Sequence, residues 1–175
     1  VSGARFIVHR DIYDAFVTGI AARADAITLG DPMADTTQIG PVISKASQDR
    51  CKRMIATAKA GGAVQVAGAS DPDLPAPFDQ GFYIRPTVFK DVRPEQELFL
   101  EEVFGPVISI TPFDTEEEAL ALANTGTFGL GVSIWSRDIA RAHRLSLGIR
   151  GGVVWLNDHH RNDPRSAWGL SLITT

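Results

Sequence analysis

Short apolar runs alternate with amphipathic helical segments along this chain, and that alternation constrains its fold more than any other feature. Runs that are continuously apolar and separated by helices of roughly 10–15 residues are typical of a largely parallel sheet covered on both faces. The expected strands are residues 6–8, 64–66, 83–84, 87–89, 107–111, 129–135 and 153–156. The sequence therefore predicts one α/β domain, with a largely parallel sheet and helices on both faces.

The helices expected between these runs have polar residues suited to their ends. Asp11 is expected to cap the first helix, whose apolar face would be Ile12, Phe16 and Ile20. A second helix is expected over residues 44–60, with Cys51 on its apolar face and two glycines after its end. Two more are expected, one after the capping residues Asp114 and Thr115 and one over residues 138–147.

Composition excludes several classes of protein. The formal net charge is −4 and the 17 Lys and Arg residues are scattered along the chain, so neither nucleic acid nor an anionic membrane is an expected partner. A single cysteine cannot form an internal disulfide, which favours a cytoplasmic location. No apolar run reaches the length of a membrane span. The chain starts at Val1 rather than Met, and we expect both of its ends to be cuts through something longer.

Six ordered segments carry a resemblance to a known family. They are Ser2-Gly3-Ala4-Arg5, Gly30-Asp31-Pro32 with Gly40-Pro41, Tyr83-Ile84-Arg85-Pro86-Thr87, Glu101-Glu102-Val103-Phe104-Gly105-Pro106-Val107, Asn124 to Leu130, and Gly152 to Asn157. The fourth segment is the most specific, because it resembles the EE-[IV]-FGPV signature of the aldehyde dehydrogenase superfamily. The resemblance runs over residues 1–169, as a partial catalytic domain. Residues 170–175 resemble nothing in the family and are interpreted as a divergent or non-native tail.

The resemblance implies an activity and a cofactor. Enzymes of this family oxidise an aldehyde to a carboxylic acid with NAD or NADP, through a cysteine thiohemiacetal, and are commonly homo-oligomers. By resemblance, Glu102 would accept hydrogen bonds from a cofactor ribose and Phe104 would lie against the nicotinamide ring. The nucleophilic cysteine and the general-base glutamate would lie upstream of Val1, so the 175 residues alone are expected to be inactive.

A polar stretch after the last predicted strand is the second candidate region. Loops after the carboxyl ends of parallel strands are where ligands bind in α/β sheets, although such a loop can also be no more than solvated surface. The resemblance places residues 157–164 at the aldehyde entrance, with His160, Arg161, Asn162 and Trp168 as lining. Arg161 would suit an anionic, carboxylated aldehyde and Trp168 an aromatic one.

Other interpretations of the same residues remain open. Glu102 could be a solvated turn residue and Phe104 a core anchor. Cys51 lies on an apolar helix face, where a buried thiol is inert, and it is not expected to be a nucleophile. Asp158, His159, His160 and Asp163 are of the types that bind metals, but adjacent histidines on an extended chain point to opposite sides, so no metal site is expected. The alternative function is a non-catalytic truncated α/β module that acts as a structural or self-association partner.

Overall fold

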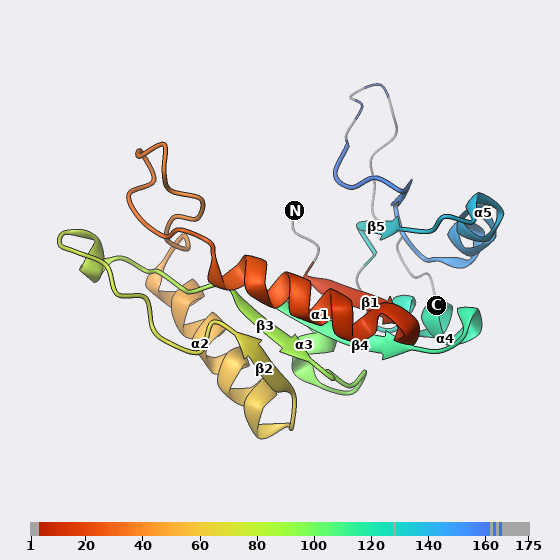
Figure 1. Ribbon diagram of the computed structural model, residues 1–175, viewed down its shortest axis with the longest axis horizontal. Helices are drawn as coiled ribbons and strands as arrows, with labels where there is room; N and C mark the ends of the chain where they lie inside the picture. The colour runs from red at the N-terminus through yellow and green to blue at the C-terminus, as the bar shows by residue number, and fades with distance from the viewer. Residues whose placement is uncertain (1–3, 128, 162, 164, 166–175) are drawn as a thin grey trace. The chain divides into compact units, whose positions relative to one another are not determined.

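The computed structural model describes residues 4–127, 129–161, 163 and 165. Helices and strands alternate along the chain as the sequence predicts (Figure 1). They form two compact units. The larger unit is Ala4–Pro112, and the smaller unit is built from Phe113 onward. Both units combine parallel strand pairs with helices, so the predicted α/β fold class is confirmed.

The larger unit is built on a four-stranded sheet in the order β1-β4-β3-β2. Strands β3 and β4 are parallel, with Thr87 opposite Val107, whereas β2 joins β3 in the antiparallel direction at the end of the sheet. This antiparallel pair makes the sheet mostly rather than wholly parallel. The elements of this unit are β1 (Arg5–His9), α1 (Arg10–Asp25), α2 (Lys45–Ala60), β2 (Val64–Ala67), η1 (Phe78–Gln80), β3 (Thr87–Lys90), α3 (Glu97–Leu100) and β4 (Val107–Phe113).

Helices cover both faces of this sheet. Val8 of β1 and Val88 of β3 lie in one buried cluster with Tyr13 and Val17 of α1, so α1 covers their face. Because neighbouring side chains of a strand point to opposite faces, Arg5 points the other way. Its guanidinium lies 4.6 Å from the centre of the Phe99 ring of α3, so α3 covers the second face.

Helix α2 is joined to α3 by a paired hydrogen bond. Arg53 of α2 donates from two nitrogens to the two carboxylate oxygens of Glu97 in α3, both at 2.8 Å. This fork geometry fixes orientation as well as distance. The hydrogen bond from Arg53 holds the pKa of the Glu97 carboxyl below its usual value, so the pair stays ionised at neutral pH.

Three local predictions in the larger unit are wrong. Helix α1 begins at Arg10, and its N-cap is His9, whose ring accepts from the Asp11 N–H at 3.2 Å, so Asp11 is not the cap. Ile12, predicted on the apolar face of α1, is 58% exposed, whereas Phe16 and Ile20 of the same predicted face pack against the core beside the buried Tyr13 and Val17. The strand predicted at residues 83–84 does not form.

The backbone around residues 83–84 is held by side chains instead of a strand ladder. Pro86 has no N–H to donate to a ladder. The Tyr83 carbonyl accepts from Gln48 of α2 at 3.1 Å, and the Tyr83 hydroxyl donates to the Gly30 carbonyl at 2.8 Å. Both Tyr83 and Ile84 are nevertheless buried, which explains their apolar character. The short helices α3 and η1 were not predicted, because four and three residues are too few for a periodicity to show.

The smaller unit pairs two parallel strands with two helices. Its elements are α4 (Glu116–Ala123), β5 (Gly131–Ile134), α5 (Ile139–Gly148) and β6 (Val153–Leu156). Thr115 caps α4 by accepting from the Glu118 N–H at 3.2 Å, and Asp138 caps α5, as the polar residues at these positions predicted. Glu116 of α4 is bound by Arg141 and Arg144 of α5, so one carboxylate joins the two helices.

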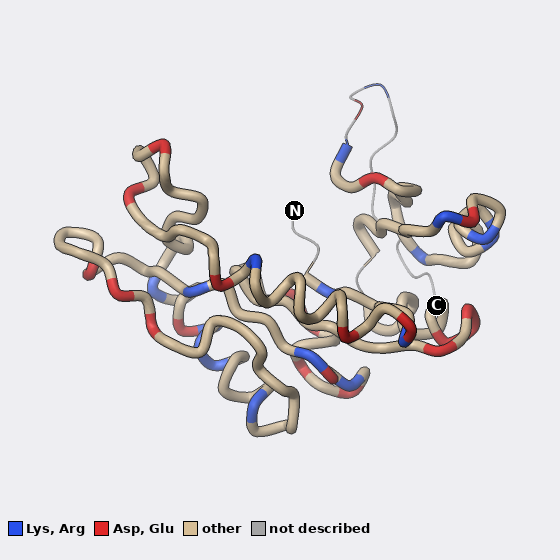
Figure 2. The backbone as a smooth tube through the Cα atoms, viewed as in Figure 1, with Lys and Arg blue, Asp and Glu red and all other residues tan. Residues whose placement is uncertain are grey.

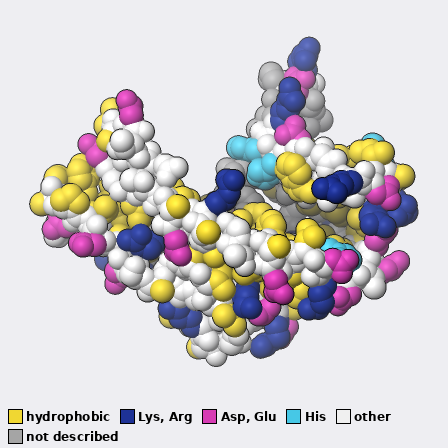
Figure 3. Space-filling view, in the orientation of Figure 1, with side chains coloured by type: hydrophobic (Ala, Val, Ile, Leu, Met, Phe, Trp, Pro, Cys, Tyr) yellow, Lys and Arg dark blue, Asp and Glu magenta, His cyan; other side chains and the backbone are white. Residues whose placement is uncertain are grey.

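Charges of both signs are interspersed along the backbone and on the face of the molecule that is drawn in space-filling form (Figures 2 and 3). No helix among the described residues is long and apolar enough to cross a membrane.

Candidate functional site

The predicted site residues lie in both units. Glu102 and Phe104 are in the loop between α3 and β4 of the larger unit, and His160 and Arg161 follow β6 in the smaller unit. Asn162 and Trp168 lie outside the described residues. Glu102 and Phe104 thus share one loop of the larger unit, and His160 and Arg161 share one loop of the smaller unit.

Glu102 and Phe104 are presented to solvent by a loop that is anchored between them. Val103 is 2% exposed, whereas Phe104 is 79% exposed, so Val103 and not Phe104 holds the loop to the core. The interpretation of Phe104 as a core anchor is therefore wrong. Phe104 also has a φ of 56°, in the left-handed region that a bulky residue rarely adopts. Such backbone strain persists only where surrounding contacts impose it, and it is concentrated at functional positions.

Three contacts hold the backbone on each side of these two residues. Arg50 of α2 donates to the Glu102 carbonyl oxygen over 2.7 Å. The Pro106 carbonyl accepts from the Thr87 N–H at 2.8 Å, which ties the loop to β3. Gly105 lies so close to Cys51 that a Cβ at this position would overlap the Cys51 sulfur. The loop is thus fixed through its main chain.

The Glu102 side chain is left available by this arrangement. Its backbone carbonyl is held by Arg50, but no hydrogen bond to its carboxylate is present within the described part of the chain. A free carboxylate on a fixed backbone can accept two hydrogen bonds from a vicinal diol. An exposed aromatic ring two residues away offers a flat apolar surface beside it.

Cys51 has a structural role. It is fully buried, and burial raises the pKa of its thiol, so the reactive thiolate is disfavoured. This agrees with the expectation that Cys51 is not a nucleophile. Its sulfur instead packs against Gly105, behind the loop that presents Glu102 and Phe104.

The loop after β6 is held by side chains of its own unit. The Asn157 amide accepts from the Ser136 N–H and donates to the Ser136 carbonyl, both at 2.9 Å. The Trp155 ring nitrogen donates to the Arg161 carbonyl at 2.9 Å, and the hydroxyl of Ser133 lies 2.7 Å from Nδ1 of His159. Asn157 and His160 have φ values of 52° and 60°, so this loop also holds non-glycine residues in the left-handed region.

His160 and Arg161 are exposed on this loop. The Arg161 side chain is 84% exposed, and its nearest carboxylate, that of Asp158, is 3.9 Å from its guanidinium. Arg165, by contrast, forms two hydrogen bonds with the Asp163 carboxylate at 3.0 and 2.8 Å. Arg161 is therefore the less engaged of the two arginines and the more available to an anionic ligand.

The sequence did not indicate the residues that hold these loops. Arg50, Ser133 and Ser136 lie far along the chain from the residues they position, and nothing in their local pattern marks them. The metal-binding residue types after β6 do not assemble a site, since no three His, Cys, Asp or Glu side chains converge within the described residues.

The chain resembles known proteins over nearly all of its length. Residues 1–169 match the model of the aldehyde dehydrogenase family. A betaine aldehyde dehydrogenase of Sinorhizobium fredii is 42% identical over 91% of this chain, and one of Brucella anthropi is 38% identical over the same share. In both cases the match spans 32% of the relative, so this chain corresponds to about a third of the length of its curated relatives.

Solved structures agree with the sequence match. The betaine aldehyde dehydrogenase of Staphylococcus aureus, solved in complex with NAD+, superimposes with a TM-score of 0.91 at 35% identity, covering 95% of this chain and 33% of that one. A variant aldehyde dehydrogenase of Bacillus cereus gives 0.89 at 33% identity, with the same coverage. On the family match, the relatives and the shared fold, this chain belongs to the aldehyde dehydrogenase family.

Proposed function

We propose that this chain is the part of an NAD(P)-dependent aldehyde dehydrogenase that receives the nicotinamide end of the cofactor and lines part of the aldehyde entrance. The observation that carries the proposal is the loop between α3 and β4. Its backbone is fixed by Arg50, Thr87 and Cys51, while Glu102 and the Phe104 ring remain exposed. The NAD+ bound by the Staphylococcus aureus relative supports this cofactor.

Each of the two residues has a separate task in this proposal. Glu102 accepts hydrogen bonds from the two ribose hydroxyls, and Phe104 lies against the nicotinamide ring and limits its positions. The oxidised cofactor supplies the hydride acceptor. The chain's own contribution is orientation, because a loop held through its main chain loses little conformational entropy when the cofactor binds. Within the family-matched residues 1–169, this loop forms part of a catalytic domain, with residues 170–175 as a tail outside it.

The 175 residues by themselves are expected to be inactive. Family chemistry needs a cysteine thiolate, and the single cysteine of this chain is buried with a raised pKa. A homogeneous preparation mixed with NAD+ and an aldehyde should form no NADH above a buffer blank. Aldehyde-dependent NADH formation that survives purification to homogeneity would contradict this expectation.

In the full-length enzyme that contains this chain, Glu102→Gln is expected to raise the KM for NAD(P)+ by roughly tenfold, because one charge-assisted hydrogen bond to the ribose is lost. Glu101→Gln is the matched control, since Glu101 is the neighbouring exposed carboxylate, and it should change KM by less than about twofold. Steady-state kinetics at saturating aldehyde measure both. Equal effects of the two substitutions would sink the assignment of Glu102.

We propose a carboxylated, anionic aldehyde as the substrate, on the availability of Arg161. The aromatic alternative rests on Trp168, which lies outside the described residues. Arg161→Ala is then expected to lower kcat/KM for a carboxylated aldehyde by roughly threefold to tenfold, with little effect on a neutral aromatic aldehyde. Arg165→Ala is the control, because that arginine is already bound to Asp163. The relatives are named for betaine aldehyde, a cation with a quaternary ammonium group, and they suggest a cationic substrate as the competing outcome. A preference for a quaternary ammonium aldehyde, increased by Arg161→Ala, would show that Arg161 opposes a cationic substrate and would overturn our proposal.

A cytoplasmic location and a homo-oligomeric state also belong to this proposal. The single buried cysteine supports a reducing compartment. Size-exclusion chromatography with light scattering on the full-length enzyme tests the oligomer, and a strictly monomeric active enzyme would contradict it.

A further inference from the structure

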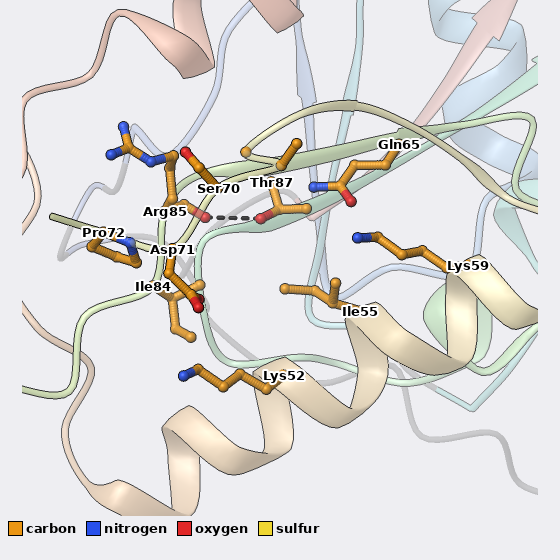
Figure 4. A pocket seen from close by; sticks show the side chains of 12 residues that line it. Lys52, Ile55, Lys59, Gln65, Ser70, Asp71, Pro72, Ile84, Arg85 and Thr87 are labelled. Carbon is orange, nitrogen blue, oxygen red and sulfur yellow. Dashed lines mark hydrogen bonds between the residues drawn. The ribbon is translucent and has the colours of Figure 1, made fainter.

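A hollow in the larger unit lies apart from the loop of Glu102 and Phe104. Helix α2 forms one wall, the end of β2 with residues 68–72 forms a second, and residues 84–87 form a third (Figure 4). Its volume is about 130 Å³, enough for a small ligand. Gly68 shapes the rim, because its φ of 75° and its closeness to the Pro86 carbonyl leave no room for a side chain.

Three cationic side chains from two segments line this hollow. Lys52 and Lys59 lie on α2, and Arg85 precedes β3. The single acid in the same lining is Asp71, so the formal charge of the lining is +3 − 1 = +2, in a chain whose net charge is −4. Among the described residues none of the three cations has an ion pair, whereas other basic residues, such as Lys45 and Arg53, are paired with acids. A hollow with a positively charged lining attracts anions.

Arg85 provides an independent sign of a missing partner. Its Nε is buried and has no hydrogen-bond partner among the described residues. A buried N–H without an acceptor costs about 1–3 kcal/mol. The backbone beside it is fixed, because the Thr87 hydroxyl donates to the Arg85 carbonyl at 2.8 Å, the bond drawn dashed in Figure 4. An anion that reaches Arg85 would supply the acceptor that this N–H lacks.

The spacing of the two lysines indicates the charge of the ligand. They lie seven residues apart, which is about two turns and about 10 Å along the helix axis, and so on one face. Ile55 lies between them, and Figure 4 shows both lysine side chains extending toward the hollow from α2. The long lysine side chains can reach into the hollow from both positions, so an anion that carries more than one negative charge suits this pair better than a monoanion does.

We propose that this hollow is a binding site for a small phosphate-type polyanion, with Lys52, Lys59 and Arg85 as its cationic contacts. Lysines act as point charges toward phosphate, and the arginine provides directed N–H donors. The proposal does not depend on the proposed dehydrogenase function, since none of these residues is assigned to the cofactor or the aldehyde.

The test is titration of the 175-residue chain with pyrophosphate, inorganic phosphate and acetate at low ionic strength, followed by calorimetry and by amide NMR shifts. Pyrophosphate should saturate a single site, with shifts centred on residues 68–71 and 85, and should bind more tightly than phosphate. Acetate should not saturate. Lys59→Gln and Lys52→Gln should each weaken pyrophosphate binding by about tenfold, because one charge-assisted contact is lost.

Lys45→Gln is the matched control, because Lys45 is also an exposed lysine of α2 but is paired with Asp49. It should change the affinity by less than about twofold. Both lysines of the hollow are exposed, so their substitution should leave the fold intact, and a circular dichroism spectrum checks this. The proposal is overturned if pyrophosphate does not saturate, if acetate binds as tightly, or if Lys45→Gln weakens binding as much as Lys59→Gln.

Discussion

Phe89→Ala is expected to destabilise the larger unit by about 3–5 kcal/mol, the largest effect of any single substitution proposed for this chain. Phe89 has no exposed surface and lies in β3, between β4 and β2 at the centre of the sheet. Truncation to alanine removes the burial of an aromatic ring and leaves a cavity that a sheet paired on both sides cannot readily collapse.

Phe104→Ala is the control for this prediction, since the same truncation is made at a ring that is 79% exposed. It should change the unfolding free energy by less than about 0.5 kcal/mol. Urea unfolding is followed by circular dichroism, and the amide NMR signals of residues 4–112 report on the larger unit. A loss from Phe104→Ala as large as that from Phe89→Ala would show that Phe104 is a core residue.

Gly105→Ala is expected to lower the free energy of unfolding by about 1–3 kcal/mol, because the new methyl group would overlap the sulfur of Cys51. Both residues are held in place, Cys51 by burial in α2 and Gly105 by the hydrogen bond from the Val107 N–H to its carbonyl at 2.8 Å. The overlap must therefore displace the loop that carries Glu102 and Phe104. In the proposed full-length dehydrogenase, the same substitution should raise the KM for NAD(P)+.

A second substitution separates the steric cause from a general effect of adding a methyl group. Cys51→Ala removes the sulfur and should restore at least about 1 kcal/mol in the Gly105→Ala background, although alone it destabilises by leaving a small cavity. Gly19→Ala in α1 is the control, because nothing lies within 4 Å of a Cβ there. Gly19→Ala should raise the free energy of unfolding by about 0.5–1 kcal/mol. Strictly additive effects of the Cys51 and Gly105 substitutions would disprove the contact.

The elements that the sequence predicted well are those whose signal is local. Helix α2 was predicted over residues 44–60, with Cys51 on its apolar face and glycines after its end, and the structure has the helix at Lys45–Ala60 with Cys51 buried and Gly61 as its C-cap. Helix α1 was predicted with the wrong cap, and of its predicted apolar face Phe16 and Ile20 pack against the core while Ile12 is exposed. His9 is not a common cap, and Ile12 is as apolar as the residues that are buried, so periodicity alone could not choose between neighbouring faces.

For the proposed site, the amino-acid sequence by itself determined which loop we propose, because the segment from Glu101 to Val107 resembles the family signature. Only the tertiary structure decided that Val103 is the anchor and that Phe104 is exposed, since an apolar residue beside a turn is equally consistent with either role. The contacts of Arg50 with Glu102 and of Cys51 with Gly105 join residues more than fifty positions apart. The same holds for Arg85 and the two lysines of α2, which are scattered in sequence and line one hollow in the fold. Local patterns record the propensity and burial of single segments, whereas these pairings depend on how the segments pack, which no local pattern specifies.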